Sequence, residues 1–228
     1  MRLLATFLVT TLLLADGSGK LLSKYSDSDV PLNVDPESTF WSGAPSVIAD
    51  SGPKGTPEAG YRTEIRSRWT DKDLYLLYTC PYQVLNLHPN PSTATETNQL
   101  WNWDVAEAFI GADFNHIRQY KEFQVSPQGE WVDLEIDRDH PKPGGGAAWN
   151  SGYQVMAKID QDKKIWYGAM KIPFAALGVD KPAAGTEMRI NLFRIQGPKP
   201  NQVFIAWQRT DSASFHVPEA FGRIALTK

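Results

Sequence analysis

Cysteine and net charge are both scarce in this sequence. The single cysteine, Cys80, cannot form an internal disulfide, and its place in an apolar run predicts a buried rather than a reactive side chain. The formal net charge is −3, from 23 basic and 26 acidic residues. This small charge gives no electrostatic case for binding nucleic acid, which needs clustered Lys and Arg, so no nucleic-acid partner is expected.

Long apolar runs are also lacking, apart from one at the N-terminus. Residues 3–15 follow the positive charge of Arg2; the run is too short to span a bilayer but matches the apolar region of a secretory signal peptide. We therefore expect a signal peptide over residues 1–19, no stable membrane span, and a secreted, periplasmic or extracellular location. The alternative is a buried first strand or a short helix close to a membrane.

Helical periodicity is nearly absent, whereas period-two alternation recurs along the chain. Residues 61–69 (YRTEIRSRW) alternate strictly, which predicts a half-buried strand that returns through the turn at 71–73 as a second strand over 74–80. Further strands are predicted at 132–136, 153–159, 165–172, 188–194 and 203–207. One short helical turn is predicted at 172–178, with Gly178 as its C-cap.

Many short strands joined by short linkers rich in Pro and Gly favour an all-β fold. We predict an antiparallel β-sandwich, similar to immunoglobulin or jelly-roll folds, with at most one short helical turn. The linkers are too short to separate domains, so residues 20–228 are expected to form a single domain.

Aromatic residues, in contrast, are plentiful. The 8 Trp, 8 Tyr and 10 Phe exceed the usual need of a core of this size, which suggests that some of them face a ligand. Trp101 stands just before a predicted strand, in which the side chain of Glu107 is expected on the same face as those of Val105 and Phe109. A carboxylate among apolar neighbours is costly unless it is paired. Glu107 is therefore either structural, in a salt bridge or at a strand end, or a hydrogen-bond acceptor for a polar ligand beside Trp101, where an aromatic ring suits the C–H face of a sugar.

Six segments, taken in order, resemble carbohydrate-binding module family 9 and its family-9-like relatives. They are residues 69–76 (WTDKDLYL), 101–110 (WNWDVAEAFI), 120–129 (YKEFQVSPQG), 166–178 (WYGAMKIPFAALG), 188–194 (MRINLFR) and 215–224 (FHVPEAFGRI). The resemblance spans residues 30–228. It implies a β-sandwich that binds glucans, xylans or their ends as a non-catalytic module, in the setting of polysaccharide catabolism.

The resemblance also implies a set of ligand-binding residues. In sugar-binding members two tryptophans clamp the terminal sugar; the first matches Trp101 and the second falls on Phe215. Gln124 takes the place of an arginine, which removes a fixed charge and a bidentate donor. The polar residues of the site match Glu107, Gln124 and Asn191, and the residues expected to shape the rim are Trp103 and Asp104.

A non-catalytic sugar-binding module requires no cofactor, but calcium accompanies some members of the family in a structural role. Oxygen ligands for calcium are available but lack EF-hand spacing, which favours their interpretation as solvated turn residues over a calcium site. They are Asp113, Asn115, Asp133, Asp137 and Asp139. The four histidines show no spacing typical of a zinc site.

Three other functions compete with sugar binding. A glycoside hydrolase needs two carboxyl groups facing across a bond, for which the residue types available are Glu107, Glu122, Asp104 and Asp133. A haem-binding redox module would use a Met and a His, from Met156, Met170 and Met188 with His88, His116 and His216. An envelope domain that has lost its sugar would instead contact a protein partner. If Trp101 and Phe215 are packed together or buried, no slot for a sugar is left and this last function is favoured.

Overall fold

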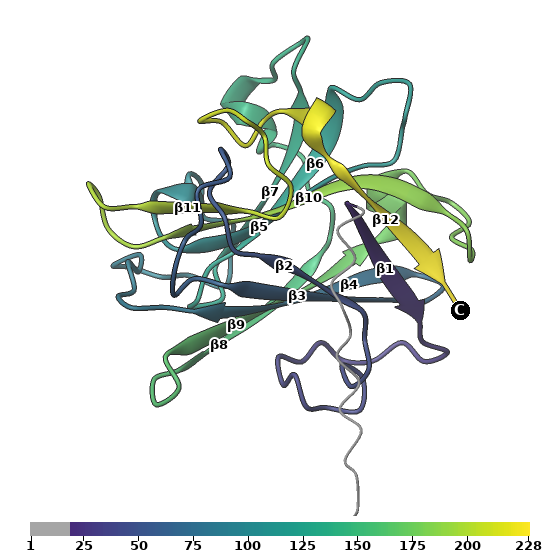
Figure 1. Cartoon of the computed structure of the whole chain (residues 1–228). Helices are drawn as coiled ribbons and strands as arrows, with labels where there is room; N and C mark the ends of the chain where they lie inside the picture. Colours follow the sequence, from purple (N-terminus) through teal and green to yellow (C-terminus); the bar gives the residue numbers. More distant parts are fainter. Residues whose placement is uncertain (1–18) are drawn as a thin grey trace, which may run out of the picture.

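The computed structural model describes residues 19–228 (Figure 1). The predicted signal peptide therefore lies, except for Gly19, outside the described residues. The strands are β1 (Lys20–Tyr25), β2 (Ser46–Ala49), β3 (Thr63–Trp69), β4 (Asp73–Pro81), β5 (Val105–Gly111), β6 (Gln119–Val125), β7 (Trp131–Asp137), β8 (Gln154–Asp160), β9 (Ile165–Pro173), β10 (Glu187–Gln196), β11 (Val203–Ala206) and β12 (Gly222–Thr227). The all-β prediction is confirmed, and the strands predicted from alternation are found within a few residues of their expected bounds.

The strands follow one hydrogen-bonded path that folds into two layers. The path runs β7-β6-β5-β10-β12-β1-β3-β4-β9-β8, with β11 added beside β10 and β2 beside β3. In Figure 1 the layer with β5, β7 and β11 lies over the layer with β3, β8 and β9, and β12 and β1 lie next to each other at one side. The main core takes Ile65 and Leu76 from one layer and Ala108 and Leu192 from the other. The architecture is therefore a β-sandwich.

Strand pairing is antiparallel except at β1. This first strand lies parallel to both β12 and β3. Parallel neighbours need long crossover connections, and the chain supplies them, because residues 26–62 separate β1 from β3 and nearly the whole sequence separates it from β12. The antiparallel prediction thus holds for the other ladders and fails at this one strand.

The structure contains more helical turns than the one predicted from the sequence. The described residues contain four short 3₁₀ segments, η1 (Leu100–Asn102), η2 (Pro143–Gly146), η3 (Phe174–Leu177) and η4 (Pro218–Ala220). Only η3 lies where the sequence predicted a turn, and Gly178 caps it in the left-handed conformation with φ 73°. The other three are single turns within loops, too short to produce a helical period. No helix within residues 19–228 is long and apolar enough to cross a membrane.

Alternation in β3 follows the predicted faces. Thr63, Ile65 and Trp69 are buried, and the alternating charged residues are half-buried. The charged face is covered by the segment that follows β1, since Arg66 donates to the carbonyl of Pro36 at 2.7 Å. Cys80 is buried as predicted, and burial raises the pKa of its thiol to about 12.

Candidate functional site

The outer face of the layer formed by β5, β6, β7, β10 and β11 carries the candidate site. Every residue of β5 is buried, although only alternate residues face the main core. Phe109 therefore belongs to a second apolar cluster, shared with Tyr120, Leu134 and Phe193 from neighbouring strands. An outer sheet face covered by its own cluster and flanking loops can form a pocket on a rigid base.

This face contains a cavity of about 340 Å³, within the size range of small-molecule sites. Its floor is the sheet, one wall is the end of β7 with the segment that follows it, and the opposite wall is aromatic. The floor residues are Glu107, Phe109, Glu122, Leu134 and Ile195; the wall at the end of β7 comprises Glu135, Ile136 and Asp137 of the strand and Arg138, Pro141, Lys142 and Gly145 after it; the remaining lining residues are Trp101, Phe204, Ala213, Phe215 and His216.

Three of the aromatic rings that line the cavity, those of Trp101, Phe204 and Phe215, differ in how exposed they are. Trp101, on η1, is half-buried against the apolar cluster. Phe215 is only 8% exposed, because one face of its ring stacks on Phe193 with centroids 4.1 Å apart and planes at 14°. Phe204 meets the Phe215 ring edge-on at 5.7 Å and is 39% exposed. The open aromatic surface therefore belongs to Trp101 and Phe204, while Phe215 is mostly packed.

Two carboxyl groups lie together in the floor. Glu107 is opposite Gln124 in the β5–β6 ladder, and Glu122 is two residues from Gln124 on the same face. Both acids are nearly inaccessible, with 2% and 3% of their surface exposed. Gln124 donates to Glu122 Oε1 at 2.5 Å, and Glu122 Oε2 has no hydrogen-bond partner among residues 19–228.

Burial controls the charge of this pair. It raises the pKa of Glu122 to about 7, and burial followed by the repulsion of Glu122 raises the pKa of Glu107 well above its usual range. The pair therefore holds at least one proton at neutral pH. A carboxylic acid beside a carboxylate can donate one hydrogen bond and accept others, which suits a ligand with hydroxyl groups.

His216 closes the floor at the other side of Glu122. Its Nδ1 lies 2.6 Å from the hydroxyl of Tyr120, and its Nε2 lies 3.9 Å from Glu122 Oε2. Burial, followed by the nearby charge of Arg138, lowers the pKa of His216 to about 4. The imidazole is therefore neutral at pH 7, and at 3.9 Å it forms neither an ion pair nor a hydrogen bond with Glu122. When Tyr120 donates to Nδ1, the Nε2–H is left facing the carboxyl pair.

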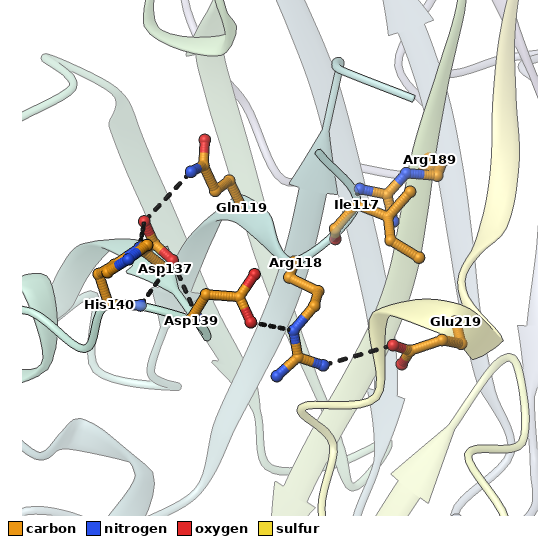
Figure 2. Close-up of polar contacts among 8 residues, drawn as sticks. All are labelled: Ile117, Arg118, Gln119, Asp137, Asp139, His140, Arg189 and Glu219. Atoms are coloured by element: carbon orange, nitrogen blue, oxygen red, sulfur yellow. Dashed lines mark hydrogen bonds and ion pairs between the residues drawn. The ribbon is translucent and has the colours of Figure 1, made fainter. Parts of the chain in front are cut away.

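The two flanking segments are joined by polar contacts at one end of the site (Figure 2). Arg118 donates to Asp139 at 2.6 Å and to Glu219 at 3.4 Å, and so bridges the segment after β7 and the segment after Phe215. Asp137 accepts the backbone N–H groups of Asp139 and His140, both at 2.9 Å, which fixes the start of the wall. Exposed ion pairs contribute little each, so their effect here is to position the segments rather than to stabilise the fold.

The predicted ligand-binding residues divide into two groups. Trp101, Phe215 and Glu107 line one cavity, as the resemblance implies. Gln124 is fully buried beneath Glu122 and does not reach the cavity surface. Asn191 is also fully buried and holds the 207–208 backbone: its Oδ1 accepts from the N–H of Gln208 at 3.0 Å, and its Nδ2 donates to the Gln208 carbonyl at 3.0 Å. The structure therefore gives Gln124 and Asn191 supporting places under the site.

The two residues expected at the rim lie elsewhere. Trp103 packs edge-on against His88, with ring centroids 4.2 Å apart. Asp104 is fully buried and accepts from the N–H groups of Asn86 at 3.0 Å and Gly197 at 2.5 Å, and burial raises its pKa to about 6. A carboxylate so engaged braces the loops around β10 instead of forming a rim.

The acids considered for calcium do not form a cluster. Within the described part of the chain, no three His, Cys, Asp or Glu side chains lie close enough to hold a metal ion. Asp113 accepts from the N–H of Asn115 at 2.7 Å, and Asp133 from the N–H of Ser151 at 2.7 Å. Local N–H groups thus occupy oxygens that calcium would need. Met170, one of the methionines considered for haem, lies in the main core.

The sequence alone did not assign Phe204, His216 or Glu122 to the ligand site. Glu122 stands two residues before Gln124, so strand parity already places the two side chains on one face. His216 adjoins Phe215 and could have been included by proximity. Phe204 carries no such signal, because its position at the cavity depends on the pairing of β11 with β10.

Residues 19–228 thus form a two-layer β-sandwich with an aromatic and acidic pocket on one outer sheet face. The model of the family described as "Carbohydrate family 9 binding domain-like" matches residues 35–228, and the chain belongs to this family. The resemblance identified from the motifs is thus confirmed.

Three known proteins are similar to this chain in sequence or in structure. A curated protein from Arthroderma benhamiae named "Extracellular protein" is 27% identical over 187 residues, which are 76% of this chain and 79% of that protein. A family 9 carbohydrate-binding module from Caldicellulosiruptor kristjanssonii, solved with cellotriose, has a TM-score of 0.64 at 16% identity over 91% of this chain and 93% of its own. The same organism's module solved with glucose has a TM-score of 0.63 at 15% identity, over 91% and 95%. At these identities the likeness shows the fold.

Proposed function

We propose that this protein is a non-catalytic module that binds a neutral oligosaccharide of glucan or xylan type in the cavity of about 340 Å³. The observation that carries the proposal is the meeting of the half-buried Trp101 with the buried carboxyl pair Glu107 and Glu122 in one cavity. Family membership supports carbohydrate as the ligand class, and two of the structural relatives are complexes with cellotriose and glucose.

Each part of the site suits a different part of a sugar. The Trp101 ring offers an apolar face to the axial C–H groups, and the edge of Phe215 limits the cavity opposite the floor. The carboxyl pair donates to one hydroxyl and accepts from others, which replaces the hydrogen bonds that the sugar loses to water. Gln124 and Asn191 act indirectly, by holding Glu122 and the backbone around Gln208.

Isothermal titration calorimetry with the variant Trp101→Ala tests this proposal. The ligands are cellotriose and xylotriose, and the matched control is Trp103→Ala, since Trp103 is also half-buried but packs on His88. We expect Trp101→Ala to weaken binding by at least about 30-fold, in line with a central aromatic anchor, and to reduce stability by less than about 2 kcal/mol. Unchanged affinity in Trp101→Ala would refute the site, and a large loss of stability as well would identify Trp101 as a core residue.

Hydrolysis is the second candidate, and the two floor carboxyls favour testing it. Glu107 and Glu122 are diagonal neighbours on one sheet face, whereas glycosidases place their carboxyls on two sides of the scissile bond. We expect no release of reducing sugar from cellulose or xylan. Turnover that Glu107→Gln abolishes would replace the binding proposal with an enzymatic one.

We further propose that the protein acts outside the cell. The N-terminal residues resemble a signal peptide, and the curated relative is named an extracellular protein. Fractionation of expressing cells, with N-terminal sequencing of the exported form, would locate the protein. Retention of an intact N-terminus inside the cell would contradict export. A protein partner in the envelope is the alternative if no glycan binds.

A further inference from the structure

A second hollow of about 470 Å³ adjoins the cavity. Its walls are the loop over residues 52–58 and the segment 201–204, and it shares Phe204 and Ala213 with the first cavity. The two hollows are therefore neighbours along one surface, separated by the Phe204 ring. No motif in the sequence indicated a role for residues 52–58 or 201–204.

The position of Phe204 follows from the sheet. In the β10–β11 ladder Phe204 is opposite Ile195, which lies in the floor of the first cavity, so both side chains point to the same outer face. A single exposed apolar residue is common on protein surfaces and by itself indicates nothing. Phe204 differs because its ring is 39% exposed, touches Phe215 edge-on, and lines both hollows.

The second hollow is built on fixed backbone. The N–H of Ala206 donates to the Ser51 carbonyl at 2.8 Å, and the N–H of Thr210 donates to the Pro53 carbonyl at 2.9 Å. Within the loop, the N–H of Gly52 donates to the Thr56 carbonyl at 2.7 Å. These bonds hold residues 51–56 against β11. A preformed hollow loses little conformational entropy when it binds a ligand.

Polar side chains line the second hollow, and one of them is unsatisfied within residues 19–228. Gln202 Nε2 is buried and has no hydrogen-bond partner among the residues that the structure describes. A buried donor without a partner is costly and marks a place where a ligand or water acceptor belongs. Lys54 and Glu58 line the same hollow, so both donors and acceptors surround it. An open aromatic ring beside such groups is the chemistry that a hydroxyl-rich, neutral ring prefers.

We propose that the second hollow is a further sugar subsite, so that one oligosaccharide extends from the first cavity across Phe204 to Gln202 and the 52–58 loop. This inference rests on the proposed function and deepens it from sugar binding to recognition of an extended chain. Phe204 acts as a stacking platform between the subsites, and Gln202 donates a hydrogen bond to the distal unit.

Calorimetry with two ligand series, glucose with cellotriose and xylose with xylotriose, tests the inference. The variants are Gln202→Ala, which changes only the second hollow, and Phe204→Ala, which changes the shared platform. Phe114→Ala is the matched control, because Phe114 is also an exposed phenylalanine, 42% accessible, and lines neither hollow. Thermal melts of each variant verify folding.

We expect the wild type to bind the trisaccharide at least tenfold more tightly than the matching monosaccharide. Gln202→Ala should weaken trisaccharide binding about 3- to 10-fold, the effect of one hydrogen bond, and leave the monosaccharide unchanged. Phe204→Ala should weaken the trisaccharide more than the monosaccharide, and Phe114→Ala neither. Equal wild-type affinity for mono- and trisaccharide, or a Gln202→Ala variant with unchanged trisaccharide affinity, would overturn the second subsite and leave the first intact. No wild-type binding of any of these sugars would refute the proposed function, and the subsite with it.

Discussion

Replacing Glu122 by Gln should stabilise the protein at neutral and alkaline pH. Burial raises the pKa of Glu122 from 4.5 to about 7, so between these values the folded state holds a proton that the unfolded chain has released. The stability of the wild type therefore falls as pH rises through this window. The full shift lowers the free energy of unfolding by about 3 kcal/mol above pH 7 and has little effect near pH 4.5.

Glutamine keeps the shape of the side chain and the acceptor for Gln124, but has no charge to desolvate. In a protein of this size 1 kcal/mol changes Tm by about 2–4 °C, so Glu122→Gln should melt about 6–12 °C higher than wild type at about pH 8. Near pH 4.5 the two curves should almost coincide. Scanning calorimetry from pH 4.5 to 8.5 measures the difference directly.

Glu135, in the wall beside the pair, provides a control of opposite sign. Hydrogen bonds from Lys121 and Lys142 lower its pKa, so its contribution is present at neutral pH and is lost as pH falls through the lowered value. Glu135→Gln should therefore destabilise at pH 7 and approach wild type in acid. A Glu122→Gln variant with the same Tm difference at every pH, or less stable than wild type at pH 8, would refute the buried, proton-sharing pair.

Two further predictions distinguish residues that hold the site in place from residues that contact the ligand. Asn191→Ala should destabilise by about 2–4 kcal/mol in chemical denaturation, because the variant leaves the half-buried N–H and carbonyl of Gln208 without their side-chain partner. The folded variant should keep its sugar affinity; a selective loss of affinity would instead make Asn191 a ligand contact. Gly146→Ala should weaken sugar binding several-fold, because the new Cβ would meet the Glu135 carbonyl oxygen in the cavity wall. The control is Gly144→Ala, which is also at positive φ (62°) but has no atom within 4 Å of the new Cβ and should bind normally. Equal affinities for the two variants would refute this role of the wall.

Part of the fold was predictable because several strands, such as β3 and β8, carry their own alternation of buried and less buried residues. β3 and β4 form the predicted hairpin, and η3 ends at the glycine that the sequence indicates. The parallel position of β1 was not predictable, because it depends on contacts with β12, the strand at the other end of the chain. The single-turn η segments were missed for a different reason, since one turn contains no period to detect.

The site was predictable in part, and strand parity explains which part. Parity and motif together identified Glu107 and Trp101, which do line the cavity. They could not predict how deeply each side chain is buried beneath the cavity surface. This difference in burial separates Glu107, which lines the cavity, from Gln124 and Asn191, which lie below it on the same face. Depth depends on which loops cover a strand, and those contacts join residues far apart in the sequence.

Position 124 connects the sequence departure to the chemistry of the pocket. The family resemblance leads one to expect arginine there, and the ladder places this position opposite Glu107 and in contact with Glu122. A guanidinium at that point would favour the ionised form of both carboxyls. Gln124 offers Glu122 one neutral hydrogen bond and no charge, so the two buried acids can lower their energy only by keeping a proton. Glutamine at position 124 therefore leaves the pocket with a shared proton in place of the fixed positive charge that an arginine would supply. The protonated carboxyl can donate a hydrogen bond, and the other carboxyl oxygens can accept one.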